Sequence, residues 1–319
     1  MTFFRRRSAA PAGVIVNDPA LDDEGLRVAR DHANRGDWHP AEELLRDAGD
    51  DWDRRGHAID VLAQATVADA GWADRWCAER PADAGAAAVR GWGEVHRAWA
   101  VRGADWADNT GDEAFQGFFE RLTLARGLCE RAIELGQDDP TPWAAMLWLA
   151  IGQDERPDEF HRRWNELAAR DPHNRLGHIA ALQYLAEKWH GSHEQMYAFA
   201  RKATAPWAAV LPLQAHIEYV LIEEGKGFKH AYKVADFWKD SPEAKADLDT
   251  ALTWLSGPEP GHAMALHDLT VVGYALAQAE RWPEARELFS RIGNRAYEYP
   301  WYYKGDPLKA FTKALRKAY

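Results

Sequence analysis

Apolar residues recur at the three- and four-residue spacing of an amphipathic helix, almost without interruption from residue 20 to the end. No stretch keeps the strict alternation of apolar and polar residues that marks a half-buried strand. Turn-forming residues break the helical pattern at 35–37, 49–51, 138–140, 171–174, 190–192 and 256–258. We therefore predict an all-α protein whose helices are joined by short loops.

Two segments near opposite ends of the chain share one arrangement of small and large apolar residues. Residues 25–48 and 269–292 each predict a helix, a short turn and a second helix. In both segments a small residue of the first helix precedes a small residue of the second by twelve positions; the pairs are Ala29 with Ala41 and Gly273 with Ala285. Small facing side chains let antiparallel helices approach closely. The spacing resembles the tetratricopeptide repeat of about 34 residues.

The middle of the chain carries weaker copies of the same pattern. Ala125, Cys129 and Ala132 form a stripe of small residues typical of a second helix, and the helix endings before Pro140 and Pro172 resemble repeat boundaries. We predict a tetratricopeptide-like α-solenoid of antiparallel helix pairs, wound into a right-handed superhelix.

No serine–glycine linker or block of charge divides the chain, so we expect one continuous array. Residues 1–18 are expected to form a flexible lead-in, residues 19–306 the helical-repeat array, and residues 307–319 a C-terminal capping helix. The turn-rich acidic stretch 103–113 is the place where a joint would fall. The capping helix would cover the end of the array with an apolar stripe, Leu308, Phe311, Leu315 and Ala318.

The charge of the chain narrows the choice of partners. Asp and Glu outnumber Lys and Arg by 50 to 39, which gives a net charge of -11. Nucleic acids and anionic membranes bind clustered Lys and Arg, so we expect neither as a partner. No run reaches the roughly 18 apolar residues of a membrane helix. The two cysteines, Cys77 and Cys129, are too few to staple a secreted protein of this size, which predicts a cytoplasmic location.

Sixteen tryptophans are many for a chain of 319 residues. Such large aromatic surfaces are costly to leave in water, so the indoles either pack between helices or line a recognition groove. Residues 51–110 are rich in them but show no clean repeat phase; this stretch holds Trp72, Trp76, Trp92, Trp99 and Trp106.

Residues 185–201 carry the most distinctive short motif, Lys-Trp-x-Gly-Ser-x-Glu-x-Met followed by Phe-Ala-Arg. It falls on Lys188, Trp189, Gly191, Ser192, Glu194, Met196 and Phe199 to Arg201, with Asp171-Pro172 upstream. Over residues 115–205, about a third of the chain, the sequence resembles an uncharacterised bacterial family of tetratricopeptide-like proteins. The resemblance implies a helical-repeat fold and no particular activity. His190 stands where the family has a small residue, so no role of this histidine carries over.

The same segment holds the best candidate for a polar site, formed by His190, His193 and Glu194. These side chains can gather around a metal ion or a polar ligand. Helix capping explains the residue types without a ligand: Gly191 takes the left-handed conformation that ends one helix, and Ser192 caps the next one together with Gln195. We favour capping and expect neither a metal nor a cofactor.

Catalytic motifs do not rise above background. His193-Glu194 is followed by Tyr197 where the zinc-protease motif requires a second histidine. The acidic run 50–53 lacks the spacing of a magnesium-binding Asp-Asp-x-x-Asp cluster. Neither a P-loop nor a Gly-x-Ser-x-Gly motif is present. These observations favour a protein that is not an enzyme.

We expect a protein-interaction scaffold that receives a peptide or helix of a protein partner on a concave helical-repeat surface. The side chains expected at this surface are Tyr184, Trp189, His190, Tyr197, Trp301 and Tyr303. The aromatic stretch 297–303 with the lysines that follow it can dock an acidic peptide, or seal the last repeat as a cap.

Two alternatives stay open. One is an enzyme, or an enzyme accessory subunit, with a polar interhelix pocket around His190, His193 and Glu194. The other is a structural subunit that assembles with copies of itself through exposed end faces.

Overall fold

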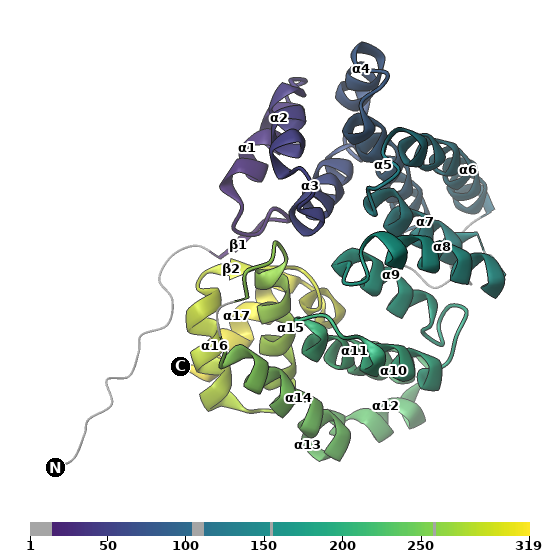
Figure 1. Ribbon diagram of the computed structural model, residues 1–319. Helices are drawn as coiled ribbons and strands as arrows, with labels where there is room; N and C mark the ends of the chain where they lie inside the picture. The colour runs from purple at the N-terminus through teal and green to yellow at the C-terminus, as the bar shows by residue number, and fades with distance from the viewer. Residues whose placement is uncertain (1–14, 104–111, 154–155, 258–259) are drawn as a thin grey trace. The chain divides into compact units, whose positions relative to one another are not determined.

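The computed structural model describes residues 15–103, 112–153, 156–257 and 260–319 (Figure 1). Over these ranges the structure is 73% helical and has almost no strand, which confirms the predicted all-α class. The chain divides into two compact units. The N-terminal unit is Asp22–Met196, and the C-terminal unit combines Tyr197–Tyr319 with the segment that ends at Leu21.

The N-terminal unit is a succession of helices joined by short turns. They are α1 (Glu24–Ala33), α2 (His39–Ala48), α3 (Trp52–Ala65), α4 (Gly71–Glu79), α5 (Ala84–Arg102), α6 (Asp112–Leu135), α7 (Thr141–Gly152), α8 (Pro157–Arg170), α9 (Arg175–Tyr184) and the start of α10 (His193–Lys202). The turns predicted at 35–37, 49–51, 138–140 and 171–174 all separate helices and are confirmed. Most of the predicted joint 103–113 lies outside the described residues.

Side-chain caps explain where several of these helices begin. Asp23, Asp51, Asp83 and Asn174 each precede a helix and accept a hydrogen bond from a backbone N–H of its first turn. Each such cap contributes about 0.5–2 kcal/mol, because it satisfies a donor that the helix itself leaves without a partner.

Helices α5 and α6 approach each other closely at a glycine. A Cβ atom on Gly91 would lie 3.0 Å from both the backbone nitrogen and the Sγ atom of Cys129. Cys129 belongs to the predicted small-residue stripe with Ala125 and Ala132, and all three are buried as expected. Burial raises the pKa of the Cys129 thiol to about 12, so it packs as a small uncharged group.

The tryptophans of residues 51–110 pack between helices. Trp72, Trp76 and Trp92 are buried, and Trp76 stacks on Trp38, which directly precedes α2, with ring centroids 5.7 Å apart. Trp106 lies outside the described residues. The aromatic content of this region therefore serves mainly the core.

The C-terminal unit has its own apolar core. Its elements are β1 (Val16–Asn17), a 3₁₀ turn η2 (Ala208–Val210), α11 (Leu211–Gly225), α12 (Phe228–Val234), α13 (Phe237–Asp240), α14 (Pro242–Leu255), α15 (Ala265–Gln278), α16 (Trp282–Ile292), β2 (Arg295–Ala296), a second 3₁₀ turn η3 (Trp301–Lys304) and α17 (Pro307–Ala318). None of the helices in the described ranges has the length and apolar character that a membrane span needs.

Helices α15 and α16 pack closely at Gly273, one of the predicted small residues. A Cβ atom on Gly273 would lie 3.0 Å from the Cε1 atom of Phe289 and 3.4 Å from the Cδ1 atom of Ile292. Ala285 is fully buried. The corresponding pair in α1 and α2, Ala29 and Ala41, is buried as well.

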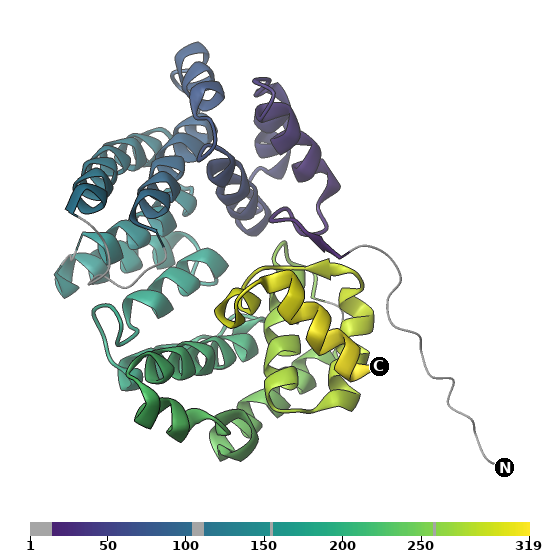
Figure 2. The ribbon, with the colours of Figure 1, turned by 180° about the vertical axis from the view of Figure 1, so that it is seen from behind.

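A short parallel pairing joins β1 to β2, with Val16 opposite Arg295 (Figures 1 and 2). The side-chain amide of Asn17 donates to Oε1 of Glu298 at 2.7 Å. These residues fall in the stretch 1–18 that we predicted as a flexible lead-in, and residues 1–14 lie outside the described residues.

Helix α17 packs on this core through the predicted apolar stripe. Phe311, Leu315 and Ala318 are buried, whereas Leu308 is exposed. Phe311 contacts Phe289 edge to face, with ring centroids 5.6 Å apart. The C-terminal helix therefore covers an apolar surface at three of the four positions.

The close approach at Gly273 predicts that a large side chain there is harmful. Gly273→Leu should lower the free energy of local unfolding of helices α15 and α16 by about 1–3 kcal/mol, because Phe289 and Ile292 must move to make room for the new side chain. The matched control is Gly127→Leu in α6, where a Cβ atom would meet nothing within 4 Å. That change should leave α6 unaffected or stabilise it by up to about 1 kcal/mol. Peptide-resolved hydrogen exchange measures both, and equal effects would contradict the packing argument.

Candidate functional site

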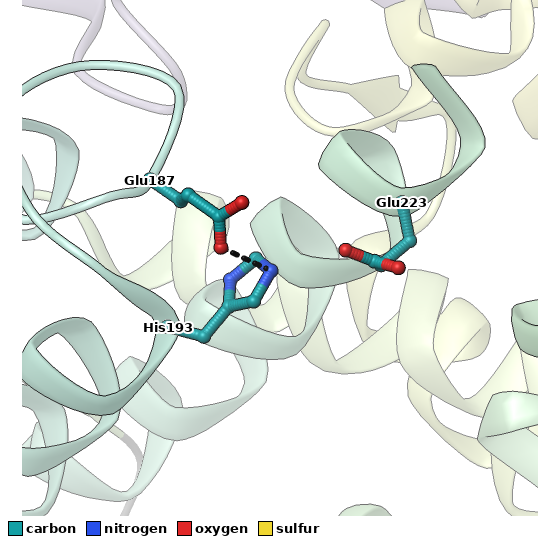
Figure 3. Close-up of side chains that lie close together, drawn as sticks. All are labelled: Glu187, His193 and Glu223. Atoms are coloured by element: carbon teal, nitrogen blue, oxygen red, sulfur yellow. Dashed lines mark ion pairs between the residues drawn. The ribbon is translucent and has the colours of Figure 1, made fainter. Parts of the chain in front are cut away.

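The loop between α9 and α10 holds the polar side chains that the sequence grouped together. Nε2 of His190 donates to the backbone oxygen of Ile151 at 2.9 Å. Nε2 of His193 lies 3.0 Å from Oε2 of Glu187 (Figure 3). Glu194 is exposed. His190 and His193 are thus engaged with different partners, and the three predicted residues do not converge on one point.

The capping interpretation of this loop is confirmed in part. Oγ of Ser192 accepts a hydrogen bond from the backbone N–H of Gln195 at 3.2 Å. The prediction of a left-handed Gly191 is wrong, because this residue is not among the glycines with positive φ. A Cβ atom on Gly191 would instead lie 2.1 Å from the carbonyl oxygen of Leu185. The glycine is needed because two stretches of backbone touch.

Trp189 belongs to a partly exposed aromatic cluster of the N-terminal unit. Its ring meets Trp99 edge to face at 5.4 Å between centroids, and Trp99 meets Trp148 in the same way at 6.4 Å. The guanidinium carbon of Arg102 lies 5.4 Å from the Trp189 centroid and 5.6 Å from that of Trp99. Burial lowers the pKa of Arg102. Cation–π contacts of this kind stabilise a cluster by about 0.5–2 kcal/mol each.

Tyr184 is a core residue. It is buried and stacks on Phe160, with ring centroids 3.7 Å apart. Its ring also lies 4.7 Å from that of His190. The side chain therefore fixes the end of α9 and is not displayed on a surface.

Tyr197 takes part in a polar chain that joins three helices of the C-terminal unit. Its hydroxyl lies 2.8 Å from Nδ1 of His216 in α11. Nε2 of His216 lies 2.9 Å from Oδ2 of Asp247 in α14, and the same oxygen accepts from Nη2 of Arg201 at 3.0 Å. Because Asp247 accepts the hydrogen bond from Nε2 of His216, the proton of the ring lies on Nε2. Nδ1 of His216 then accepts a hydrogen bond from the hydroxyl of Tyr197.

The pKa shifts of Asp247 and Tyr197 suit a structural role for this polar chain of side chains. Burial alone would raise the pKa of Asp247, but the hydrogen bonds from His216 and Arg201 outweigh it, and the pKa lies below its ordinary value. Burial raises the pKa of Tyr197. An activated nucleophile needs the opposite shift, so the hydroxyl of Tyr197 remains a hydrogen-bond donor.

The remaining predicted residues, Trp301 and Tyr303, hold η3 against the core. Trp301 is buried between Tyr274 and Phe311, with ring centroids 5.1 Å and 5.6 Å from its own. The hydroxyl of Tyr303 donates to Oε1 of the buried Glu218 at 2.9 Å. Burial and the negative charge of Glu218 raise the pKa of Tyr303 well above its ordinary range. The geometry is that of an apolar cap, and Trp301 is not displayed on a surface.

Helix α12 shows an exposed aromatic pair that the sequence analysis did not single out. Phe228 is 89% exposed and Tyr232 is 77% exposed. The two residues are four positions apart on one helix, so their side chains lie on the same face. They are the most exposed of the large hydrophobic side chains in the described residues.

Lysines accompany this aromatic pair. The segment 226–239 contains four lysines and one aspartate, a charge of 4 − 1 = +3 in a chain of net charge -11. All five charged residues are exposed: Lys226, Lys229, Lys233, Asp236 and Lys239. We call the exposed surface of Phe228, Lys229, Tyr232 and Lys233 the α12 face.

The signal for the α12 face is present in the sequence. Phe228 and Tyr232, and beside them Lys229 and Lys233, follow the four-residue period of a helix. The C-terminal aromatic and basic stretch, 297–317, was the one region that we predicted to combine these features. Exposure separates the two: Trp301 is buried, whereas the rings of α12 are in solvent.

The polar chain around Asp247 generates a stability prediction. Asp247→Asn should lower the free energy of unfolding of the C-terminal unit by about 1.5–3 kcal/mol near pH 7, because it removes a charged acceptor from two hydrogen bonds. Asp249→Asn is the matched control, since this exposed carboxylate on the same helix pairs with Arg281 at the surface and should contribute about 0–1 kcal/mol.

The difference between wild type and Asp247→Asn should also depend on pH. A carboxylate whose pKa is lower in the folded protein stabilises it above the pKa of the unfolded chain, about 3.9, and loses this contribution as pH falls through the folded value. The groups that contact Asp247 are His216 and Arg201. Urea denaturation at a series of pH values measures the effect, and a difference that grows below pH 4 would contradict it.

Comparison with known proteins gives no relative from which a role can be taken: no protein-family model, curated protein or solved structure matches the chain. Any functional assignment rests on the side chains described above.

Proposed function

We propose that this protein is a non-enzymatic interaction module that binds an acidic segment of a partner protein on the α12 face. The observation that carries the proposal is the exposure of Phe228 and Tyr232, at 89% and 77%, next to two lysines that have the same spacing.

The aromatic pair supplies affinity. Burying a large apolar side chain contributes about 1.5–3 kcal/mol, and aromatic residues are enriched in the buried centres of protein interfaces. A single exposed ring is common on soluble proteins. Two rings with this exposure on one face of a helix offer apolar surface that a partner can cover.

The lysines supply specificity. Lys226 pairs with Glu223, and Lys239 pairs with Asp236 at 2.5 Å. Lys229 and Lys233, which form the α12 face, are exposed and four residues apart. Like charges at this spacing destabilise a helix by about 0.2–0.5 kcal/mol. Carboxylates of a partner relieve that repulsion and guide the encounter with an otherwise acidic protein.

The core of the C-terminal unit holds the α12 face in place. Val234 at the end of α12 and Trp238 in α13 are buried in the core of the C-terminal unit. Nδ1 of His230, on the inner side of α12, lies 2.8 Å from Oε2 of Glu223 in α11. A surface that is already ordered loses little conformational entropy on binding.

The proposal keeps the tetratricopeptide-like fold as its framework. Helix pairs α1–α2 and α15–α16 bury small residues at the positions that the repeat pattern predicts, and this supports the assignment of repeated helix pairs. We propose the superhelical array on the same grounds, and the family resemblance on the motif of residues 185–201. An acidic protein segment is the partner that the charge of α12 favours.

A peptide selection tests the binding specificity. A phage-displayed random peptide library selected on the purified full chain should yield sequences rich in Asp and Glu that also carry an apolar residue. The double variant Phe228→Ala/Tyr232→Ala should bind a selected peptide at least about tenfold more weakly, because about 1.4 kcal/mol or more of apolar burial is lost. Isothermal titration calorimetry measures the affinities.

Control variants separate this surface from general stickiness. Phe119→Ala/Leu124→Ala removes two exposed apolar residues of α6 and should leave the affinity unchanged. Lys229→Glu/Lys233→Glu should abolish binding of the acidic peptides. Selection of peptides without acidic residues, equal binding by all variants, or binding of the chain to anionic lipid vesicles in place of peptides would each overturn the proposal.

A further inference from the structure

The N-terminal unit contains a buried carboxylate surrounded by arginines. Glu94 of α5 is completely buried. Its Oε1 accepts from Nη1 of Arg90 at 2.5 Å and from Nη1 of Arg97 at 2.9 Å, and its Oε2 accepts from Nη1 of Arg121 in α6 at 2.8 Å. Burial alone would raise the pKa of Glu94, but these arginines outweigh it and lower the pKa.

The cluster holds more positive than negative charge. Arg90 also donates from Nε to Asp74 of α4. Three guanidinium groups therefore face two carboxylates, a charge of 3 − 2 = +1 within a protein of net charge -11. The three arginines supply hydrogen bonds to both oxygens of the buried carboxylate, and one positive charge of the cluster is left in excess.

Arg97 and Arg121 are the arginines that keep N–H donors not used by Glu94. Each contacts Glu94 through one terminal nitrogen, and their side chains are 26% and 33% exposed. They bind different oxygens of one carboxylate, so Glu94 holds both guanidinium groups in one cluster. A guanidinium has five N–H donors in a fixed plane, so each keeps further donors that solvent or a ligand can reach.

We propose that Arg97 and Arg121 form a binding site for a phosphate group, with Glu94 as the residue that fixes their separation. Paired guanidinium groups match the tetrahedral oxygens of phosphate and bind them through charge-assisted hydrogen bonds. The carboxylate holds both side chains in place before the ligand arrives, which lowers the entropy lost on binding. This site is independent of the α12 face and belongs to the other unit.

Titration of the full chain with inorganic phosphate at low ionic strength tests the site, with phosphoserine as a second probe. Isothermal titration calorimetry should give a dissociation constant no weaker than the millimolar range. Tighter binding of phosphoserine identifies a phosphorylated protein segment as the source of the phosphate, and equal or tighter binding of inorganic phosphate identifies the free ion.

Arg97→Gln and Arg121→Gln should each weaken phosphate binding at least about tenfold. Each variant leaves Glu94 with two arginine partners, so the fold is retained, and circular dichroism checks this. Arg131→Gln is the matched control, because this exposed arginine of α6 pairs with Glu134 on its own helix; it should bind as wild type does. Absence of binding by both probes, or equal weakening in the control, would overturn the proposal.

Discussion

The packing of this protein depends on how closely two helices can approach where one of them lacks a side chain. At Gly91 the backbone of α6 occupies the space of a Cβ atom, and at Gly273 the ring of Phe289 does so. Such contacts allow close packing over a helix pair, and a close-packed interior tolerates little added volume. Both compact units use the same solution, although their sequences share few identical residues at these positions.

A second constraint is the cost of burying charge. Glu94 and Asp247 each accept hydrogen bonds from arginine or histidine. Glu218 accepts one from the hydroxyl of Tyr303. Buried ionised groups need such partners because desolvation alone disfavours them by several kcal/mol. Each group joins side chains from at least two elements, so these contacts also fix how neighbouring helices are aligned.

Helical periodicity and turn residues were enough to predict the class, most turns, the burial of the small residues in the paired helices and most of the buried stripe of α17. They could not show which aromatic residues are exposed, because the burial of Trp301 and the exposure of Phe228 depend on tertiary contacts. Gly191 illustrates the same limit, since a clash with Leu185 depends on the path of the loop. The arginines around Glu94 come together only through the pairing of α5 with α6.

The pairing of β1 with β2 makes the C-terminal unit discontinuous in the chain. Leu21 contributes to the same core as helices that begin more than a hundred and eighty residues later. The whole of Asp22–Met196 is thus an insertion between two pieces of one folding unit. During synthesis on the ribosome, residues 22–196 can fold before β2 has been made. The C-terminal unit can be completed only after β2 is available to pair with β1, so the order of synthesis imposes an order of assembly.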